Sequence, residues 1–299
     1  MEVRQGREEA VFLVQPTTVH DANYASPLLI AFGLGEDPPK VTVEIVVVSV
    51  AALLASGLTL FSGFGLGTLL MPVVAVFFPV EIAIAITAIV HLANNASKVV
   101  LLGKNADRSV LLSFGIPAIA FAFLGALVLG WLSAIPSMFE YEAFGTQLHV
   151  SPVKLVVGIL ILAFVMLELS PKFSSMALDK NYLPYGGVVS GFFGGLSGHQ
   201  GAFRSMFLLT AGLNKEEFVA TGAMLAIMVD ISRMLIYGWE IVGQHVSIEW
   251  PLVVAASVSA FIGAYFGSRL LKKITIRSIQ VVVSVLLVVV ALGLISGAL

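Results

Sequence analysis

Two glycine-rich interruptions lie inside long hydrophobic runs, at matching places in the two halves of the chain. The first is Ser62–Gly67 and the second is Ser197–Gly201, and 201 minus 67 gives an offset of 134 residues, which also aligns Thr87 with Thr221. The hydrocarbon core of a membrane tolerates a broken helix only where the freed backbone groups are buried in protein or line a cavity. Breaks at corresponding positions of two repeats mark binding sites in transporters. The two breaks therefore predict one shared site.

The hydrophobic runs approach or reach the length that crosses a bilayer. The chain of 299 residues is 58% hydrophobic and 11% charged, with a mean hydropathy of +1.00, whereas soluble proteins carry roughly 25% charged residues. Runs of this kind cover Val41–Leu60, Val110–Leu132 and Gln280–Ile295, against the ~20 apolar residues of a spanning helix. They lack the alternation of outer-membrane barrel strands. The sequence thus predicts an all-α polytopic protein of the cell (plasma or inner) membrane.

Composition narrows the function classes. The chain has no cysteine, which excludes disulfides and thiolate metal sites. A net charge of −2 gives no indication of a nucleic-acid partner. Two histidines, His91 and His199, lie at membrane depth without a second ligand four residues on, so we expect no metal, no cofactor and no enzymatic activity. The expected partners are the lipid bilayer and a small anion. The sequence leaves open whether the protein forms a homo-oligomer.

The apolar segments divide into two sets of five. Two of them, 66–78 and 201–213, would span only roughly 20 Å as helices, short of the ~30 Å hydrocarbon core, and are predicted to be half-helices that follow the breaks. Residues 1–40 do not resemble a signal peptide and are predicted to be an extramembrane tail, with a short interfacial segment around 27–34. The predicted repeats are 41–170 and 182–299, joined by a cytoplasmic linker at 171–181. The ten segments are 41–62, 66–78, 81–102, 109–133, 152–169, 183–197, 201–213, 216–238, 248–271 and 277–297.

Basic residues indicate the orientation. They gather after the third, fifth and ninth segments, whereas the loops 134–151 and 239–247 hold glutamates and no lysine or arginine. Because positive loops face the cytoplasm, the second repeat is predicted to be inverted relative to the first.

The fourth segment of each repeat contains a similar motif, at Phe123–Ala126 in the first repeat and at Phe261–Ala264 in the second. The small residues of this motif favour close helix packing.

The breaks have the chemistry of an anion site. A helix N-terminus presents unpaired N–H groups and a partial positive charge, and glycine lets the backbone approach a ligand closely. Half-helices that begin near Gly65 and Gly201 would aim these groups at one point near the midplane. Arg204 follows in the first turn of the second half-helix, and its planar fork suits oxyanions. The alternatives are glycines that only pack or kink helices, and an arginine that snorkels to the interface.

Polar residues near the breaks extend the candidate set. His199 and Gln200 could donate to an anion, and His199 could relay a proton, although both could equally satisfy the loop backbone. Hydroxyls often bond their own helix instead. The candidate substrate-binding residues are Arg204, His199, Gln200, Gly201, Ser197, Gly63, Gly65, Gly67, Thr68, Asn94 and Asn95.

The third segment carries a polar stripe. Residues 91, 94, 95 and 98 share one helical face, so this face is predicted to point into the protein. The counterpart segment contains Asp230 and Arg233, and Asp230 could pair with Lys98 or Arg233. The candidates for proton coupling are His91, Asp230 and His199. The alternative is structural contact between helices, which is as favourable for Lys98 and Arg233 because both lie toward segment ends.

These motifs resemble the TauE/SafE family of membrane permeases, which repeats a glycine-rich element of the form G-x-G-G-G-x-[LI]-x-x-P. The first copy is Gly63–Pro72, in which Leu66 replaces a glycine. The second copy is Gly198–Met206, in which His199 and Gln200 replace glycines and Met206 replaces the proline. The resemblance covers roughly 41–299. It implies transport of sulfite, sulfonates or related organic anions.

The sequence therefore predicts a secondary transporter of a small sulfur-containing or carboxylate anion, in which one repeat moves against the other around the site. The chain shows no ATP-binding motif, so a gradient would supply the energy. An anion channel with the same site is the first alternative. Others are a membrane scaffold and an intramembrane serine hydrolase, in which Ser197 of the Gly195–Gly198 sequence would be the nucleophile and His91 or His199 the base.

Overall fold

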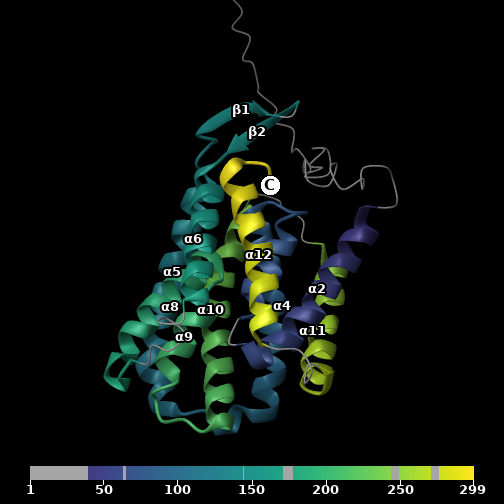
Figure 1. Ribbon diagram of the computed structural model, residues 1–299. Helices are drawn as coiled ribbons and strands as arrows, with labels where there is room; N and C mark the ends of the chain where they lie inside the picture. The colour runs from purple at the N-terminus through teal and green to yellow at the C-terminus, as the bar shows by residue number, and fades with distance from the viewer. Residues whose placement is uncertain (1–39, 63–64, 144, 171–177, 244–248, 271–275) are drawn as a thin grey trace, which may run out of the picture.

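The computed structural model describes residues 40–62, 65–143, 145–170, 178–243, 249–270 and 276–299. These residues are mostly helical (Figure 1). The predicted tail, its interfacial segment, Gly63 and most of the linker lie outside the described residues. By length and composition, three helical stretches suffice to cross a membrane: Val80–Asn105, Arg108–Ser133 and Lys215–Gly238. Shorter apolar helices accompany them, and the chain is an all-α membrane protein apart from one small sheet.

The ten predicted segments correspond in order to ten α-helices of the described chain. The first half contains α2 (Lys40–Ser62), α3 (Leu66–Val74), α4 (Val80–Leu102), α5 (Arg108–Ser133) and α6 (Pro152–Leu169). The second half contains α8 (Leu183–Ser197), α9 (Gly201–Leu208), α10 (Lys215–Gly243), α11 (Trp250–Leu270) and α12 (Ile276–Ser296). Short 3-10 turns precede α5 and α8, at Gly103–Asn105 and Lys180–Tyr182.

The half-helices α3 and α9 are shorter than predicted. The prediction extended them to residues 78 and 213, whereas they end at Val74 and Leu208. After α3 the chain tightens into turns that lead to Pro79, the residue before α4. After α9 the hydroxyl of Thr210 donates to the carbonyl of Leu178, outside the helical pattern. Hydropathy alone marks such turns as apolar and cannot separate them from the helix.

A β-hairpin replaces the loop predicted at 134–151. Strand β1 (Phe139–Ala143) pairs antiparallel with β2 (Thr146–Val150), at the end of the molecule that also holds the C-terminus of α12 (Figure 1). The Tyr141 hydroxyl donates to the carbonyl of Ser296 at 2.6 Å, which ties the hairpin to α12. Hydrogen bonds from Ser137 and His149 lower the pKa of Glu140 on β1.

The first helix of each half packs against the fourth helix of the other half. Helix α8 runs along α5 through a stripe of glycines at 187, 191 and 195, where an added Cβ would collide with α5 backbone. Helix α2 lies beside α11 in the same way (Figure 1). The shared motif noted above is part of both contacts, since Gly125 abuts the carbonyl of Phe192 and Gly263 abuts that of Leu53. Small residues therefore permit close backbone approach in both pairs.

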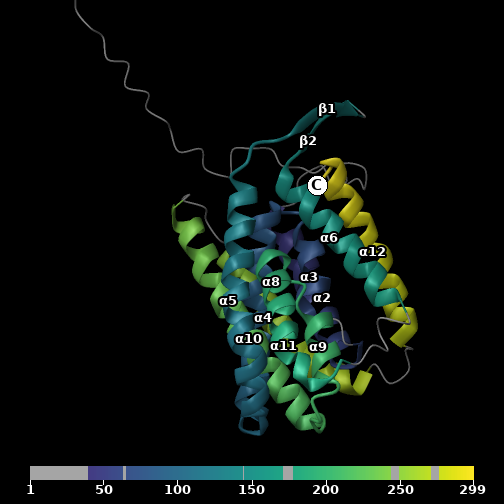
Figure 2. The same ribbon diagram turned by 90° about the vertical axis from the view of Figure 1, so that its left-hand side faces the viewer.

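The packing defines two four-helix units. We call α5, α8, α9 and α10 the first unit, and α2, α3, α4 and α11 the second; each holds three helices of one half and one of the other. Helices α4 and α10 form the main contact between them. The remaining pair, α6 and α12, lies side by side (Figure 2).

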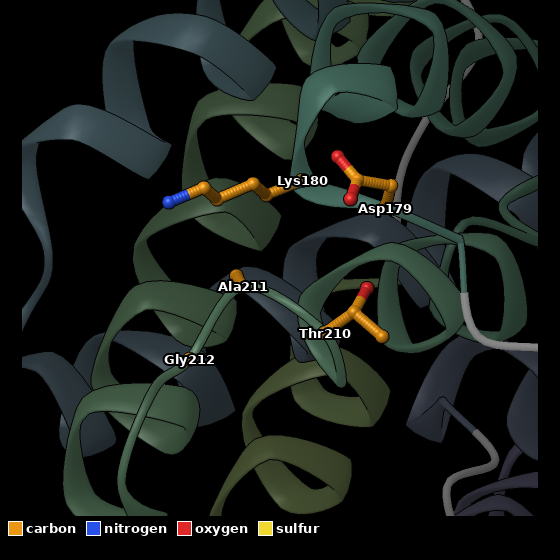
Figure 3. A pocket seen from close by; sticks show the side chains of 5 residues that line it. All are labelled: Asp179, Lys180, Thr210, Ala211 and Gly212. Atoms are coloured by element: carbon orange, nitrogen blue, oxygen red, sulfur yellow. The ribbon is translucent and has the colours of Figure 1, made fainter.

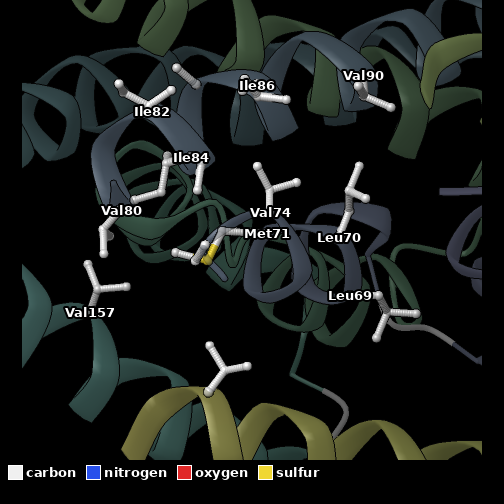
Figure 4. Close-up of a cluster of buried hydrophobic side chains, with 14 of the residues drawn as sticks. Leu69, Leu70, Met71, Val74, Val80, Ile82, Ile84, Ile86, Val90 and Val157 are labelled. Carbon is white, nitrogen blue, oxygen red and sulfur yellow. The ribbon is translucent and has the colours of Figure 1, made fainter. Parts of the chain in front are cut away.

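Apolar packing fixes α3 in the second unit. Leu69, Leu70, Met71 and Val74 are buried in one cluster with side chains of α4 and with Val157 of α6 (Figure 4). Eight of the nine residues of α3 are buried. Its first turn is consequently held in place beside the break that precedes it.

Candidate functional site

The two glycine breaks lie against each other. A Cβ added to Gly65 would be 3.9 Å from the Cα of Gly201, and one added to Gly67 would be 3.4 Å from the carbonyl oxygen of Gly198. The starts of α3 and α9 are thus in backbone contact, although 134 residues separate them in the sequence. An added Cβ would fill the space between the two breaks in van der Waals contact.

The second break turns through an unusual backbone conformation. Gly198 caps α8 with a φ of +81°, which glycine adopts at little cost. The guanidinium of Arg233 lies beside it, with Nη1 3.1 Å from the place of a Cβ. The Ser190 hydroxyl and the backbone N–H of Arg204 both donate to the backbone carbonyl of Gln200, at 3.0 and 3.1 Å. These contacts fix the point where α9 begins.

Asp230 on α10 is the centre of a buried polar network. Its Oδ1 accepts from Nη2 and Nε of Arg233, at 2.7 and 3.1 Å, and from Nε2 of Gln200 at 3.2 Å. Its Oδ2 accepts from Nδ1 of His91, on α4, at 2.6 Å. Asp230 is fully buried and Arg233 is 1% exposed. The network therefore joins both units and the second break.

Arg204 continues this network from α9. Its Nη1 donates to Oε1 of Gln200 at 3.2 Å, while Nε2 of the same amide donates to Asp230. Arg204 is half-buried. Its positive charge acts on Lys98 of α4, which has no hydrogen bond or ion pair with the described residues. Arg233 pairs with the carboxylate of Asp230, Arg204 interacts with the same carboxylate, and Lys98 interacts with Arg204, so positive charge is in excess in this cluster.

His199 lies inside the second break among aromatic rings. Its ring stacks on Phe164 of α6 with centroids 5.0 Å apart and an interplanar angle of 8°. Phe193 and Phe203 surround Phe164 edge-on. Nδ1 contacts the carbonyl and the hydroxyl of Ser197, at 2.9 and 3.1 Å, and Nε2 is buried without a partner in the described part of the chain.

Two of the four other buried polar atoms that lack partners among the described residues lie near the breaks or on the polar face of α4. They are Oγ1 of Thr87 and Nδ2 of Asn94, which are separated by two turns on the polar face of α4. Oδ1 of Asn94 accepts from Ser56 of α2 at 3.1 Å, and Cγ2 of Thr87 faces Gly67. Buried groups of this kind normally have partners, so these two atoms are available to a ligand.

Other candidates make contacts within their own helices. Nδ2 of Asn95 donates to the carbonyl of His91, and the Ser197 hydroxyl donates to the carbonyl of Phe193. Thr68 is buried in the first turn of α3 beside Gly65. Gly63 lies outside the described residues.

Arg233 is the residue whose place the sequence predicted least well. The eighth segment was predicted to end at 238, which put Arg233 toward its end, but α10 continues to Gly243. Arg233 therefore lies inside the protein and donates from Nη1 to the carbonyl of Gly194. The spacing of Asp230 and Arg233, which are three residues apart on a helix, was the available signal.

The geometry opposes His199 as the base of the serine hydrolase alternative. A carbonyl only accepts, so Nδ1 of His199 must carry the proton that it shares with Ser197, and the Ser197 hydroxyl already donates to Phe193. That arrangement cannot take a proton from Ser197.

A pocket lies beyond the C-terminal end of α9, away from the breaks (Figure 3). It is lined by Asp179, Lys180, Thr210, Ala211 and Gly212.

Comparison with known proteins gives one match. A family model described as "Sulfite exporter TauE/SafE" matches residues 48–294, which is most of the chain and includes both breaks. No curated protein and no solved structure matches.

Proposed function

The chain belongs to the sulfite exporter TauE/SafE family, and from this premise we propose that it is a secondary transporter of a small sulfur-containing anion, such as sulfite or a sulfonate, in the cell membrane. The observation that carries the proposal is the excess of positive charge where the two breaks meet. Arg204 acts on a carboxylate, Asp230, that Arg233 already neutralises, and Lys98 lies within the electrostatic reach of Arg204. An oxyanion bound there would restore the balance of charge at reduced dielectric.

Arg204 has the freedom to bind such an anion. Within the described residues, its guanidinium makes one hydrogen bond to a side chain, from Nη1 to Oε1 of Gln200. Its other guanidinium N–H groups are available, and the fork suits a sulfonate or sulfite group. The N–H groups at the starts of α3 and α9 would add to the attraction. Nδ2 of Asn94, which has no partner in the described part of the chain, would provide a further donor.

Alternating access would involve the packed units and not the two sequence repeats. Because α8 packs on α5 and α2 packs on α11, a rigid motion of residues 41–170 against 182–299 would break the closest helix contacts. We therefore propose that the first unit moves against the second across the contact of α4 and α10. The bond of His91 to Asp230 crosses that contact, which makes this pair the candidate for proton coupling.

The inversion of the repeats is part of the same proposal. Corresponding helices run antiparallel: the end of α4 meets the start of α10 through Asn105 and Glu216, and Gly158 near the start of α6 meets Ile295 near the end of α12. Antiparallel equivalents are expected of repeats with opposite orientation in the membrane. The anion would then reach both breaks from each side of the membrane in turn.

Binding isotherms test the proposed site. Arg204→Ala should weaken binding of sulfite by roughly ten- to a hundredfold, because a charge-assisted hydrogen bond contributes about 1.5–3 kcal/mol. Arg204→Lys should restore part of the affinity, since it keeps the charge and loses the fork. Arg108→Ala, at an exposed helix start, is the matched control. Wild-type affinity in Arg204→Ala would remove this residue from the site.

A further inference from the structure

The protonation pattern of His199 limits which anions suit the site. The carbonyl of Ser197 can only accept, and Nδ1 of His199 lies 2.9 Å from it. The Ser197 hydroxyl gives its own proton to Phe193, so it too can accept from Nδ1. Both contacts require the hydrogen on Nδ1. In the neutral ring, Nε2 is then a bare acceptor.

This acceptor is buried and has no partner in the described part of the chain. His199 is 3% exposed, and its ring is held by the stack on Phe164. The charged group that acts on the ring is Arg233 on α10, which pairs with Asp230. A proton added to Nε2 would place a second positive charge close to that of Arg233. A buried lone pair instead favours a ligand that brings its own donor.

We infer that the site selects singly charged oxyanions that also carry an O–H or N–H donor, which His199 accepts at Nε2 while Arg204 holds the anionic group. Hydrogensulfite and hydroxyalkanesulfonates have this chemistry. Sulfate and simple alkanesulfonates have the anionic group without the donor, and they would leave Nε2 unpaired. The inference rests on the proposed function and specifies its substrate class.

A matched pair of ligands tests the inference. Ethanesulfonate and 2-hydroxyethanesulfonate carry the same anionic group and differ by one hydroxyl donor. One hydrogen bond to a neutral acceptor corresponds to roughly threefold to tenfold in affinity. We therefore expect purified full-length protein to bind 2-hydroxyethanesulfonate roughly threefold to tenfold more tightly in calorimetric titrations. Hydrogensulfite should likewise bind more tightly than sulfate, which has no donor.

Two variants assign the preference to Nε2. In His199→Asn the amide can still donate to Ser197 but nothing replaces Nε2, so the preference should fall to about one. In His199→Gln the amide oxygen can reach the place of Nε2, so part of the preference should return. His149→Asn, on the exposed hairpin strand β2, is the control and should keep the wild-type preference.

The outcomes separate the two proposals. Equal affinity of the two sulfonates in wild type, or a preference that persists in His199→Asn, would overturn the selection of donor-bearing anions and leave the anion site standing. Failure of wild-type protein to bind either sulfonate, sulfite or sulfate would overturn the proposed function and this inference with it. The wild-type comparison decides even if a variant fails to fold.

Discussion

Asp230 is the residue on which the buried polar cluster depends. It accepts hydrogen bonds from Arg233, Gln200 and His91, and it is fully buried. Without its carboxylate, the guanidinium of Arg233 would be a buried charge whose described partners, the carbonyl of Gly194 and the hydroxyl of Tyr237, do not carry the counter-charge of a carboxylate. An uncompensated buried charge is among the most costly defects in a folded protein.

Removal of this carboxylate should therefore destabilise the protein. Asp230→Ala should lower the free energy of unfolding by about 3–5 kcal/mol, because it leaves Arg233 unpaired. Asp230→Asn should cost less, since the amide oxygen can still accept from Arg233. Glu142→Ala, at an exposed carboxylate of β1, serves as the control and should stay within about 0.5 kcal/mol of wild type. Unfolding in mixed detergent micelles measures all three, and equal stability of Asp230→Ala and wild type would exclude this role.

The sequence predicted some of these residues and not their connections. Gly65, Gly201 and Arg204 follow from the breaks, because glycine and charge are conspicuous in apolar sequence. The sequence left open whether Asp230 pairs with Lys98 or Arg233, and the pairing depends on where α10 ends. The stack of His199 on Phe164 joins two elements far apart in the chain. No periodicity within either element could predict it.

Close packing of α5 and α8 is the element-scale feature most open to test. Gly191 lies against the carbonyl of Ala118, so an added methyl group would collide with backbone. Gly238 on α10 has nothing within 4 Å of an added Cβ. The same substitution should therefore have opposite effects at the two helical positions.

Gly191→Ala should destabilise the protein by about 1–3 kcal/mol or more, because overpacking forces the helices apart. Gly238→Ala should be neutral or stabilising by up to about 1 kcal/mol, since alanine is the better helix former. The two variants are compared by unfolding in the same micelles. If Gly191→Ala were as stable as Gly238→Ala, the close contact of α5 and α8 would be wrong.

The elements themselves were largely predictable because apolar runs of helix length are distinctive. The hairpin at Phe139–Val150 was not, since each strand has only five residues and the two lie outside the hydrophobic runs. The ends of α3 and α9 were misplaced by four and five residues. In both cases the apolar turn that follows has the composition of a helix.

At the scale of the whole molecule, the inversion of the repeats has a direct test. The equivalent helices α4 and α10 end near Lys104 and near Gln244; the latter lies outside the described residues. Inverted repeats place these ends on opposite faces of the membrane, and direct repeats place them on the same face.

We expect single cysteines at positions 104 and 244 to be labelled by a membrane-impermeant reagent from opposite sides in oriented vesicles. The chain has no native cysteine, so each label reports one position. A cysteine in place of Glu142 on the hairpin should be labelled from the same side as the one at 244. Labelling of 104 and 244 from one side would refute the inversion.

The exchange of the first helices between the halves could not be predicted from the sequence. The offset relates α2 to α8 and so reveals a duplication, but it does not tell which helix each packs against. The stripe of glycines in α8 indicated a close contact without naming α5 as the partner. As a result the moving units proposed from the structure differ from the repeats proposed from the sequence.

Counterflow of sulfite in proteoliposomes tests the central claim most directly, namely that the site where the two breaks meet carries anions by alternating access. Wild-type protein should show saturable uptake of labelled sulfite that depends on unlabelled sulfite inside the vesicles, Arg204→Ala should lose most of it, and Arg108→Ala should keep it. An anion channel would give uptake without this dependence. Absence of counterflow in wild type, or full counterflow in Arg204→Ala, would contradict the claim.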